Sequence, residues 1–276
     1  MKISTINTGF FKLDGGAMFG VVPKSIWNRL NPADDRNMCN WAMRCMLIEV
    51  GDRKVLIDTG IGNKQSEKFY SYYYLNGEDS LIGSLNAKGL KADDITDVIL
   101  THLHFDHVGG AVRHNEDGAL VPAFKNATYH LTKKHWDHAC SPNPREKASF
   151  LQENFMPLQE HGVLRFTEKN EEIAPGIWAE VVSGHTVEMI CPKIETPDGI
   201  LLYAADLFPS AAHVPVNYVM GYDIEPLVTM QERNRINEMA VSEDWSLFLE
   251  HDNTYETCKV SKDERGRFKS SQMGLL

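Results

Sequence analysis

The stretch Thr101-His102-Leu103-His104-Phe105-Asp106-His107 contains three imidazoles and one carboxylate within six positions. It directly follows the short apolar run Val98-Ile99-Leu100 and leads into Gly109-Gly110, where no side chain obstructs a close backbone approach. Imidazole nitrogen and carboxylate oxygen are the usual protein ligands of zinc and related divalent transition metals. A histidine pair alone is often a surface accident, but this longer pattern between a strand and a glycine turn predicts a metal site.

The spacing within this stretch indicates how its ligands divide. Residues two apart in an extended chain point to the same side, so His102 and His104 can hold one metal ion. Asp106 and His107 follow where the chain leaves the strand, and they can face a second ion from the next turn. The cluster is compatible with one tightly held ion or with the beginning of a two-ion site.

The overall composition is ordinary for a soluble globular protein, with 42% hydrophobic and 24% charged residues. A length of 276 residues allows one large α/β domain or two small ones. No linker or internal repeat divides the chain, so we expect a single domain over residues 1–276. The formal net charge of −10 disfavours binding to a phosphate backbone, and no nucleic acid partner is expected.

The cysteines and the N-terminal residues indicate the cellular compartment in which the protein is expected. The five cysteines are odd in number and include no C-x-x-C pair, which suits reduced thiols in the cytoplasm better than a disulfide framework. Residues 1–8 lack the apolar core of a signal peptide, and no run of about 18 apolar residues exists. We therefore expect a cytoplasmic protein that does not partner a membrane.

Apolar periodicity and turn residues predict the order of the strands and helices. Strands are expected over residues 43–50, 54–58, 97–100, 128–131, 178–182, 189–194, 200–204 and 246–249. Helices are expected over residues 80–88, 145–160 and 225–240. The segment 11–30 is expected to be an apolar loop, and the polar tail 263–276 is expected to be loose.

Three further candidate ligands lie far along the chain. His185, Asp206 and His251 each come directly after a predicted strand. Strand ends in layered α/β folds are where sites assemble, because the loops there converge on one crevice. Each of the three, taken alone, is also compatible with a capped or surface polar residue. Together with the first cluster they form an inventory of five histidines and two aspartates.

The sequence resembles the metallo-β-lactamase fold hydrolases in the order of its motifs. These are H-x-H-x-D-H, then G-H-T, then an aspartate after an apolar strand, and finally a late histidine. The stretch Leu56-Ile57-Asp58-Thr59-Gly60 matches the strand and turn that precede the metal loop in that family. The resemblance covers residues 43–251. It implies an α+β fold, a four-layer αββα sandwich, with a two-metal site at one edge of the sheets.

The resemblance also implies a role for each candidate ligand. The first metal would be bound by His102, His104 and His185, the second by Asp106, His107 and His251, and both by the bridging Asp206 with a water or hydroxide. An aspartate rather than a cysteine at the bridge suits two divalent ions such as zinc, manganese, iron or cobalt, and zinc is our first expectation. Asp58 is expected to accept a hydrogen bond from a ligand histidine and to orient it.

The sequence departs from the family pattern directly after His185. Many relatives continue G-H-T-P-G-H, whereas this chain reads Gly184-His185-Thr186-Val187-Glu188-Met189. The ligand is kept but the following turn is altered. Glu188 is interpreted as a solvated surface carboxylate, with a hydrogen-bonding role as the alternative.

The N-terminal segment suggests a branch of the family. Residues 11–24, with Trp27 soon after, look like the opening of the N-acyl-homoserine lactonase and methyl parathion hydrolase-like branch. The bulky apolar side chains of this loop, expected to line a substrate pocket, are those of Met18, Phe19, Val21 and Val22. The alternative is that the segment packs as an ordinary edge of the core. In relatives it also contributes to a dimer contact, so a homodimer is expected.

Several other polar residues stay open to two interpretations. Lactonases of this fold often place a tyrosine shortly after the bridging aspartate, but no tyrosine closely follows Asp206. His213 is a candidate for a catalytic polar role at the mouth of the site, with a structural histidine as the alternative. His135 and His138 are expected to be exposed helix residues. The tyrosines between residues 70 and 74 form either a lid or part of the core.

The leading functional hypothesis is hydrolysis of an ester or lactone by a metal-bridging hydroxide, with Asp106 passing the proton to the leaving alkoxide. N-acyl-homoserine lactones are the first choice of substrate, which implies quorum quenching. The alternatives are a phosphotriesterase or arylesterase of the methyl parathion hydrolase type and a glyoxalase II-like thioesterase. The non-enzyme alternative is a metal-stabilised binding or sensor protein. Seven nitrogen and oxygen ligands without a cysteine fit an open catalytic site better than a structural one.

Overall fold

Two β-sheets packed face to face form the centre of the computed structural model, which describes all 276 residues. The first sheet has the strand order β1-β2-β3-β4-β7-β8. Its strands are β1 (Lys2–Asp14), β2 (Met38–Val50), β3 (Arg53–Ile57), β4 (Asp97–Ile99), β7 (Thr128–Leu131) and β8 (Leu164–Phe166). The first three pair antiparallel, and β3, β4, β7 and β8 pair parallel.

The second sheet has the strand order β15-β14-β13-β12-β11-β10-β9. Its strands are β9 (Glu172–Ala174), β10 (Ile177–Val182), β11 (Met189–Thr196), β12 (Gly199–Tyr203), β13 (Ser246–Phe248), β14 (Thr257–Lys262) and β15 (Phe268–Gly274). All neighbours pair antiparallel except β12 and β13, which pair parallel. A separate hairpin joins β5 (Val112–His114) and β6 (Leu120–Pro122).

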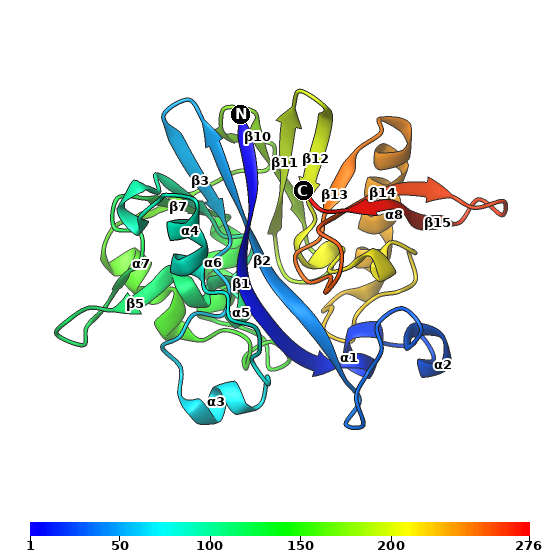
Figure 1. Cartoon of the computed structure of the whole chain (residues 1–276), viewed down its shortest axis with the longest axis horizontal. Coiled ribbons are helices and arrows are strands. Elements are labelled where there is room, and N and C mark those ends of the chain that lie inside the picture. Colours follow the sequence, from blue (N-terminus) through cyan, green and yellow to red (C-terminus); the bar gives the residue numbers. More distant parts are fainter.

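Helices cover the outer side of each sheet (Figure 1). The α-helices are α1 (Gly15–Phe19), α2 (Lys24–Trp27), α3 (Glu67–Ser71), α4 (Leu81–Ala87), α5 (Phe105–Val108), α6 (Lys133–Cys140), α7 (Met156–Glu160) and α8 (Pro226–Ser242). Short 3₁₀ turns are η1 (Ala92–Asp94), η2 (Gly109–Ala111), η3 (Gln152–Asn154), η4 (Ala205–Leu207) and η5 (Ala211–His213). Helices α4, α6 and α7 pack on the first sheet, and α8 packs on the second. No helix combines the length and the hydropathy that a membrane span requires.

The alternation of side chains along β3 shows why the layers form. Val55 and Ile57 point into the core that the two sheets share, whereas Leu56 points to the opposite face, under the helices. Parallel strands buried on both faces require such continuous apolar runs. Full burial of one such side chain contributes about 1.5–3 kcal/mol. The four layers, α/β/β/α, confirm the predicted α+β sandwich.

The predicted strands and two of the predicted helices are confirmed to within a few residues, apart from the start of β2, which begins five residues earlier than the predicted 43–50. Helix α4 begins after Ser80, whose hydroxyl accepts a hydrogen bond from the amide of Gly83 at 3.2 Å. The helix predicted over 145–160 is wrong: only η3 and α7 form there. Pro157 contributes to the difference, because it lacks the amide hydrogen that an interior helical residue donates, and it lies instead in the first turn of α7.

Both terminal predictions are corrected. The tail 263–276 is not loose: β15 pairs with β14, and Phe268 in it is buried. The segment 11–30 is not a single loop, because β1 extends to Asp14 and α1 and α2 follow. The carboxylate of Asp14 accepts a hydrogen bond from the amide of Ala17 at 2.9 Å and caps α1. The chain thus turns sharply and places α1 against the end of the sheets.

Candidate metal centre

Seven polar side chains converge where strands end at one edge of the two sheets. The segment after β4 carries His102 and His104 and leads into α5, which carries Asp106 and His107. The other three, His185 after β10, Asp206 in η4 after β12 and His251 after β13, come from the second sheet. All seven are buried, with at most 8% of the surface of any of them exposed. The structure therefore brings together every residue that the sequence proposed as a ligand.

The first group consists of His102, His104, His185 and Asp206, whose ligand atoms all lie within 4.8 Å of one another. The Nε2 atom of His185 lies 3.3 Å from Nδ1 of His104 and 3.1 Å from Oδ2 of Asp206. The Nε2 atom of His102 lies 3.9 Å from the same carboxylate oxygen. These four atoms surround a point that a divalent ion can occupy.

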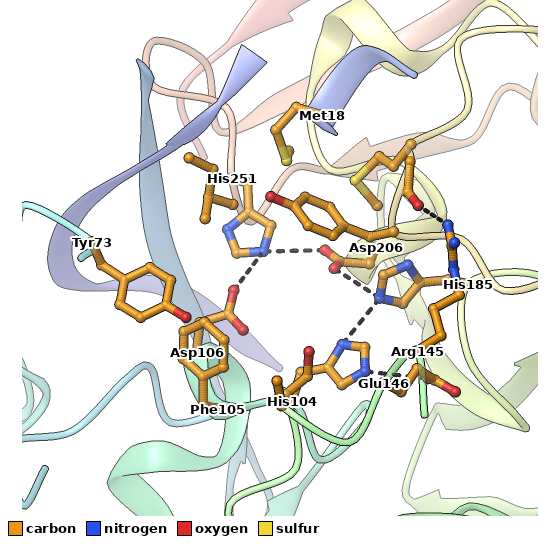
Figure 2. Close-up of a pocket in the computed structure, with 16 residues that line it drawn as sticks. Met18, Tyr73, His104, Phe105, Asp106, Arg145, Glu146, His185, Asp206 and His251 are labelled. Carbon is orange, nitrogen blue, oxygen red and sulfur yellow. Dashed lines mark hydrogen bonds and ion pairs between the residues drawn. The ribbon is translucent and has the colours of Figure 1, made fainter. Parts of the chain in front are cut away.

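The second group consists of Asp106, His107 and His251, again within 4.8 Å of one another. The Nε2 atoms of His107 and His251 are 3.2 Å apart. Asp206 also reaches this group, because its Oδ1 lies 3.1 Å from Nε2 of His251. Figure 2 shows Asp206 between His251 and His185, with one carboxylate oxygen facing each. This arrangement allows one carboxylate to contribute to two ions.

The outer hydrogen bonds of the histidines determine which ring nitrogen faces the centre. His251 Nδ1 donates to the carbonyl oxygen of Ala42 at 2.7 Å, so its Nε2 carries the lone pair. His185 Nδ1 lies 2.9 Å from the carboxylate of Asp223, which leaves Nε2 toward the centre in the same way. A ligand histidine in proteins normally donates its other nitrogen to such an acceptor.

His102, His107 and His104 follow the same rule. The hydroxyl of Thr101 donates to Asp58 at 2.7 Å, so it can accept from His102 Nδ1, 3.0 Å away. His107 Nδ1 lies 3.1 Å from Asp58, which confirms the expected hydrogen bond between this aspartate and a candidate ligand. His104 is reversed, since its Nε2 faces Glu146 at 3.4 Å and its Nδ1 faces the centre.

The inward-facing atoms lack partners within the protein. Nε2 of His102 and Oδ1 of Asp206 are buried and form no hydrogen bond of acceptable geometry. Buried polar atoms of this kind normally have a partner, so two of them beside facing imidazole nitrogens indicate a bound cation. Burial lowers the pKa of His102 well below its ordinary value, which keeps the ring neutral and its lone pair available. The residues therefore fit a divalent metal with nitrogen and oxygen ligands.

Charge around Asp206 supports the same conclusion. Burial opposes ionisation of this carboxyl, yet His185 and His251 hold its pKa well below the ordinary value. Conversely, burial opposes protonation of His185, but Asp206 raises the pKa of this histidine to about 10. The buried carboxylate therefore requires a neighbouring positive charge, which is supplied either by protons on these imidazoles or by a metal cation bound to their deprotonated nitrogens.

Glycines around the metal loop allow the backbone segments to approach one another closely. A Cβ atom at Gly109 would lie 2.0 Å from the carbonyl oxygen of Ile61, and one at Gly110 would lie 2.3 Å from that of Thr59. In the G-H-T stretch, a Cβ at Gly184 would lie 2.2 Å from the amide nitrogen of Thr229 in α8. Both glycine motifs are therefore required by packing rather than by turn flexibility.

Sequence reasoning missed three carboxylates behind the ligands. Asp223 and Glu146 orient His185 and His104, and Glu250 lies with Oε1 at 3.2 Å from His107 Nδ1. Glu250 is fully buried, and both its oxygens lack a hydrogen-bond partner. The only sequence signal was the position of Glu250 directly before His251, because the other two are far from any motif.

A cavity of about 410 Å³ opens beside the metal centre (Figure 2). Candidate ligands lining it are His104, Asp106, His185, Asp206 and His251, and apolar residues lining it are Leu13, Met18, Phe105 and Met220. Its volume lies in the lower part of the range for small-molecule sites. The cavity can therefore admit a small substrate directly onto the inward-facing ligand atoms.

Only Met18 of the predicted pocket residues lines this cavity. Phe19 is fully buried between Trp27 and His213, with ring centroids 5.3 Å and 4.7 Å away. Val22 is also buried in this aromatic cluster, whereas Val21 is 88% exposed. The turn from α1 into α2 explains the correction, because it directs consecutive side chains in different directions.

The polar role predicted for His213 is not supported by its surroundings. The ring is fully buried, and it is absent from the cavity lining. Its Nε2 donates to the carbonyl oxygen of Met18 at 2.9 Å, and the hydroxyl of Ser210 lies 2.7 Å from Nδ1. With both nitrogens engaged, His213 holds the backbone of α1 in place, and burial lowers the pKa of its ring to about 3.

The predicted exposure of His135 and His138 is also wrong. His135 is fully buried and accepts a hydrogen bond from the amide of Leu103 at 2.8 Å, within the metal loop. His138 is half-buried and lies 2.6 Å from Glu146. The helix prediction itself was correct, but this face of α6 supports the metal loop. Glu188 is half-exposed and pairs with Lys134 at 2.6 Å, so it does form a hydrogen bond.

Tyrosines contribute to the cavity from two directions. Tyr73 lines the cavity and packs on Phe105 with ring centroids 4.6 Å apart, whereas Tyr72 and Tyr74 are exposed. Tyr222 lines it too, and sequence reasoning missed it because it follows Asp206 only after a long loop. Burial, and then the charge of Asp106, raises the pKa of Tyr222, so its phenol stays protonated as a hydrogen-bond donor.

The two-sheet fold and the buried histidine and aspartate cluster define a metallohydrolase. The chain belongs to the metallo-beta-lactamase superfamily, since the model of that family matches residues 44–251. The chain is similar to an N-acyl homoserine lactonase of Bacillus cereus, at 25% identity over 253 residues that cover 86% of this chain and 90% of the relative.

Solved structures agree with this assignment. A probable metal-dependent hydrolase from Staphylococcus aureus has a TM-score of 0.88 and 30% identity, covering 98% of this chain and 97% of its own. AidC, a dizinc quorum-quenching lactonase solved with a product, has a TM-score of 0.79 at 18% identity, covering 98% and 93%, and shows the fold alone. The family and these relatives place the chain among the metal-dependent hydrolases.

Proposed function

We propose that the protein hydrolyses a small ester or lactone at a centre of two divalent metal ions. The observation that carries this proposal is the position of Asp206, with Oδ2 at 3.1 Å from His185 and Oδ1 at 3.1 Å from His251. A carboxylate with one oxygen toward each of two ligand groups is suited to hold two ions side by side. N-acyl-homoserine lactones are the first substrates to test, because the curated relatives are named for them.

The two ligand groups would divide as follows. The first ion would be held by His102, His104 and His185, the second by Asp106, His107 and His251, and both by Asp206. This set of nitrogen and oxygen donors suits zinc, with manganese, iron or cobalt as alternatives. When bound, such ions polarise a carbonyl group and lower the pKa of a water to near neutrality.

The side chains of the cavity would supply the remaining steps. Asp106 lies with Oδ2 at 3.7 Å from Nε2 of His107 and lines the cavity, where it can carry a proton to the leaving alkoxide. The phenol of Tyr222 can donate a hydrogen bond to the substrate carbonyl oxygen. The apolar wall around Met18 would receive an acyl chain and exclude bulk water from the reaction.

Less specific features of the protein complete the proposal. We expect a single domain over residues 1–276 that acts in the cytoplasm, which agrees with five cysteines that form no disulfide. A homodimer through the N-terminal segment is supported by the exposed apolar side chains of Val21, Ile26 and Leu30. The binding or sensor alternative is not retained, because the family is one of hydrolases.

A substrate-class panel on the zinc-loaded protein tests the proposal. We expect kcat/KM for N-acyl-homoserine lactones and simple lactones to exceed that for aryl phosphotriesters and thioesters by orders of magnitude. Asp206→Asn should abolish turnover, whereas Asp198→Asn in an exposed turn serves as the matched control. Rapid phosphotriester or thioester hydrolysis with no lactone turnover would replace the proposed substrate class.

A further inference from the structure

We propose that Arg145 binds a carboxylate of the substrate, so that the preferred ester or lactone is an anionic one. This inference rests on the proposed function and deepens it by naming the substrate class. Arg145 is the only lysine or arginine among the residues that line the cavity. Figure 2 shows it beside Glu146 and His185, on the side of the cavity away from Tyr73.

The guanidinium of Arg145 has no acidic partner in the protein. Its Nη2 donates to the carbonyl oxygen of Gly221, and no other hydrogen bond or ion pair of the guanidinium is formed. An arginine has five N–H donors in a planar fork, so most of its donors remain free. The side chain of Arg145 is exposed, so these donors are accessible to a ligand that enters the cavity.

The three carboxylates that line the cavity with Arg145 interact with other residues. Glu146, its neighbour in sequence, lies 2.6 Å from His138 Nε2 and accepts from the side-chain amide of Asn143 at 2.7 Å. Its other oxygen faces His104. Asp106 and Asp206 belong to the ligand groups. Arg145, which is exposed at the cavity wall, therefore forms no ion pair with any of these carboxylates.

The hydrogen bond to Gly221 holds Arg145 toward the cavity. The amide of Gly221 donates to the carbonyl oxygen of Ala17 at 2.7 Å, next to Met18. The backbone of Gly221 thus connects three segments of the cavity wall, those around residues 17, 145 and 221. A long side chain anchored in this way loses less conformational freedom when it binds a ligand than a free one does.

The chemistry of guanidinium favours a carboxylate as the occupant. Arginine and carboxylate form paired, charge-assisted hydrogen bonds that are stronger than bonds to neutral acceptors. A neutral N-acyl lactone offers only amide and ester oxygens, which do not use the charge. The cavity of about 410 Å³ suits a small acid whose ester group lies on the metal ligands and whose carboxylate lies on Arg145.

The test compares two lactones of nearly equal shape on the zinc-loaded enzyme. One is γ-butyrolactone with a carboxylate on the carbon beside the ring oxygen, and the other carries the primary carboxamide there. We expect kcat/KM to be at least about tenfold higher for the acid, because a hydrogen bond to a charged group is stronger than one to a neutral amide. Arg145→Gln should bring this ratio close to one, and Arg145→Lys should preserve part of it.

A purely structural role for Arg145 would lower turnover of both lactones by the same factor and leave the ratio unchanged, which would overturn the inference. Equal kcat/KM for the two lactones with the unaltered enzyme would also overturn it, while the proposed function would stand. If neither lactone is cleaved, binding of glutarate and of its monoamide by calorimetry still tests the subsite. Tighter binding of glutarate would support it, and equal binding would refute it.

Discussion

The substitution Asp58→Asn tests the role of the carboxylate behind the second ligand group. Asp58 accepts from the amide and hydroxyl of Thr101 at 2.8 Å and 2.7 Å, and it lies 3.1 Å from His107 Nδ1. Its backbone has φ of 57°, a left-handed conformation that asparagine tolerates better than most residues. Asparagine therefore removes the charge with little backbone strain, which alanine would not do.

The expected effect is a weaker second metal site. Loss of a hydrogen-bonding partner behind a ligand histidine costs about 10- to 100-fold in metal affinity. Glu250 lies with Oε1 at 3.2 Å from His107 Nδ1 and can replace part of the lost interaction. We therefore expect the lower end, about tenfold, which corresponds to about 1.4 kcal/mol.

Competition with a chromogenic chelator measures the two zinc affinities separately. The affinity of the second equivalent should fall more than that of the first in Asp58→Asn, because Asp58 contacts His107 directly but reaches His102 only through the hydroxyl of Thr101. Asp223→Asn is the matched variant, and it should weaken the first ion instead, since Asp223 lies 2.9 Å from His185 Nδ1. Unchanged affinity for both equivalents in Asp58→Asn would show that Asp58 does not support metal binding.

Three further outcomes are expected. Tyr222→Phe should lower kcat for a lactone by about tenfold without changing the zinc content, because one hydrogen bond to the charge that develops on the carbonyl oxygen is lost. The same kcat in Tyr222→Phe and in the unaltered enzyme would exclude the phenol from the reaction. Asp97, buried against His130 and Arg53, has a pKa held below its ordinary value despite its burial, so its contribution to stability is present above about pH 4 and is lost as the pH falls further. Asp97→Asn should therefore flatten the fall of the urea midpoint between about pH 5 and pH 2. Chelation should lower the melting temperature of the zinc-loaded protein, because a ligand at about 100 times its Kd stabilises by about 2.7 kcal/mol; an unchanged melting temperature would argue against bound metal.

The candidate ligands could be predicted from the sequence because each follows a strand and belongs to a recognisable local pattern. The strand 97–100 and the H-x-H-x-D-H stretch are contiguous, so spacing alone suggests their geometry. The same holds for the helix over 225–240, whose apolar face packs Ile236 and Ala240 against the second sheet. Local patterns of this kind determine local structure.

The cavity wall could not be predicted in the same way. Arg145, Tyr222 and Met18 come from three distant segments that only the packed fold brings together. The expected helix over 145–160 failed for a related reason. Its apolar residues Phe150, Phe155 and Leu158 are spaced as in a helix, but they are buried from an irregular segment interrupted by proline. Burial of His213 likewise depends on α1, which the sequence presented as a loop.

Asp206 is proposed to lie between two metal ions. Anomalous diffraction at the zinc absorption edge from crystals of the zinc-loaded protein locates these ions. We expect two peaks about 3.5–4 Å apart, one beside each oxygen of Asp206. A single peak surrounded by His102, His104 and His185 alone, or none at saturating zinc, would show that Asp206 does not bridge two ions.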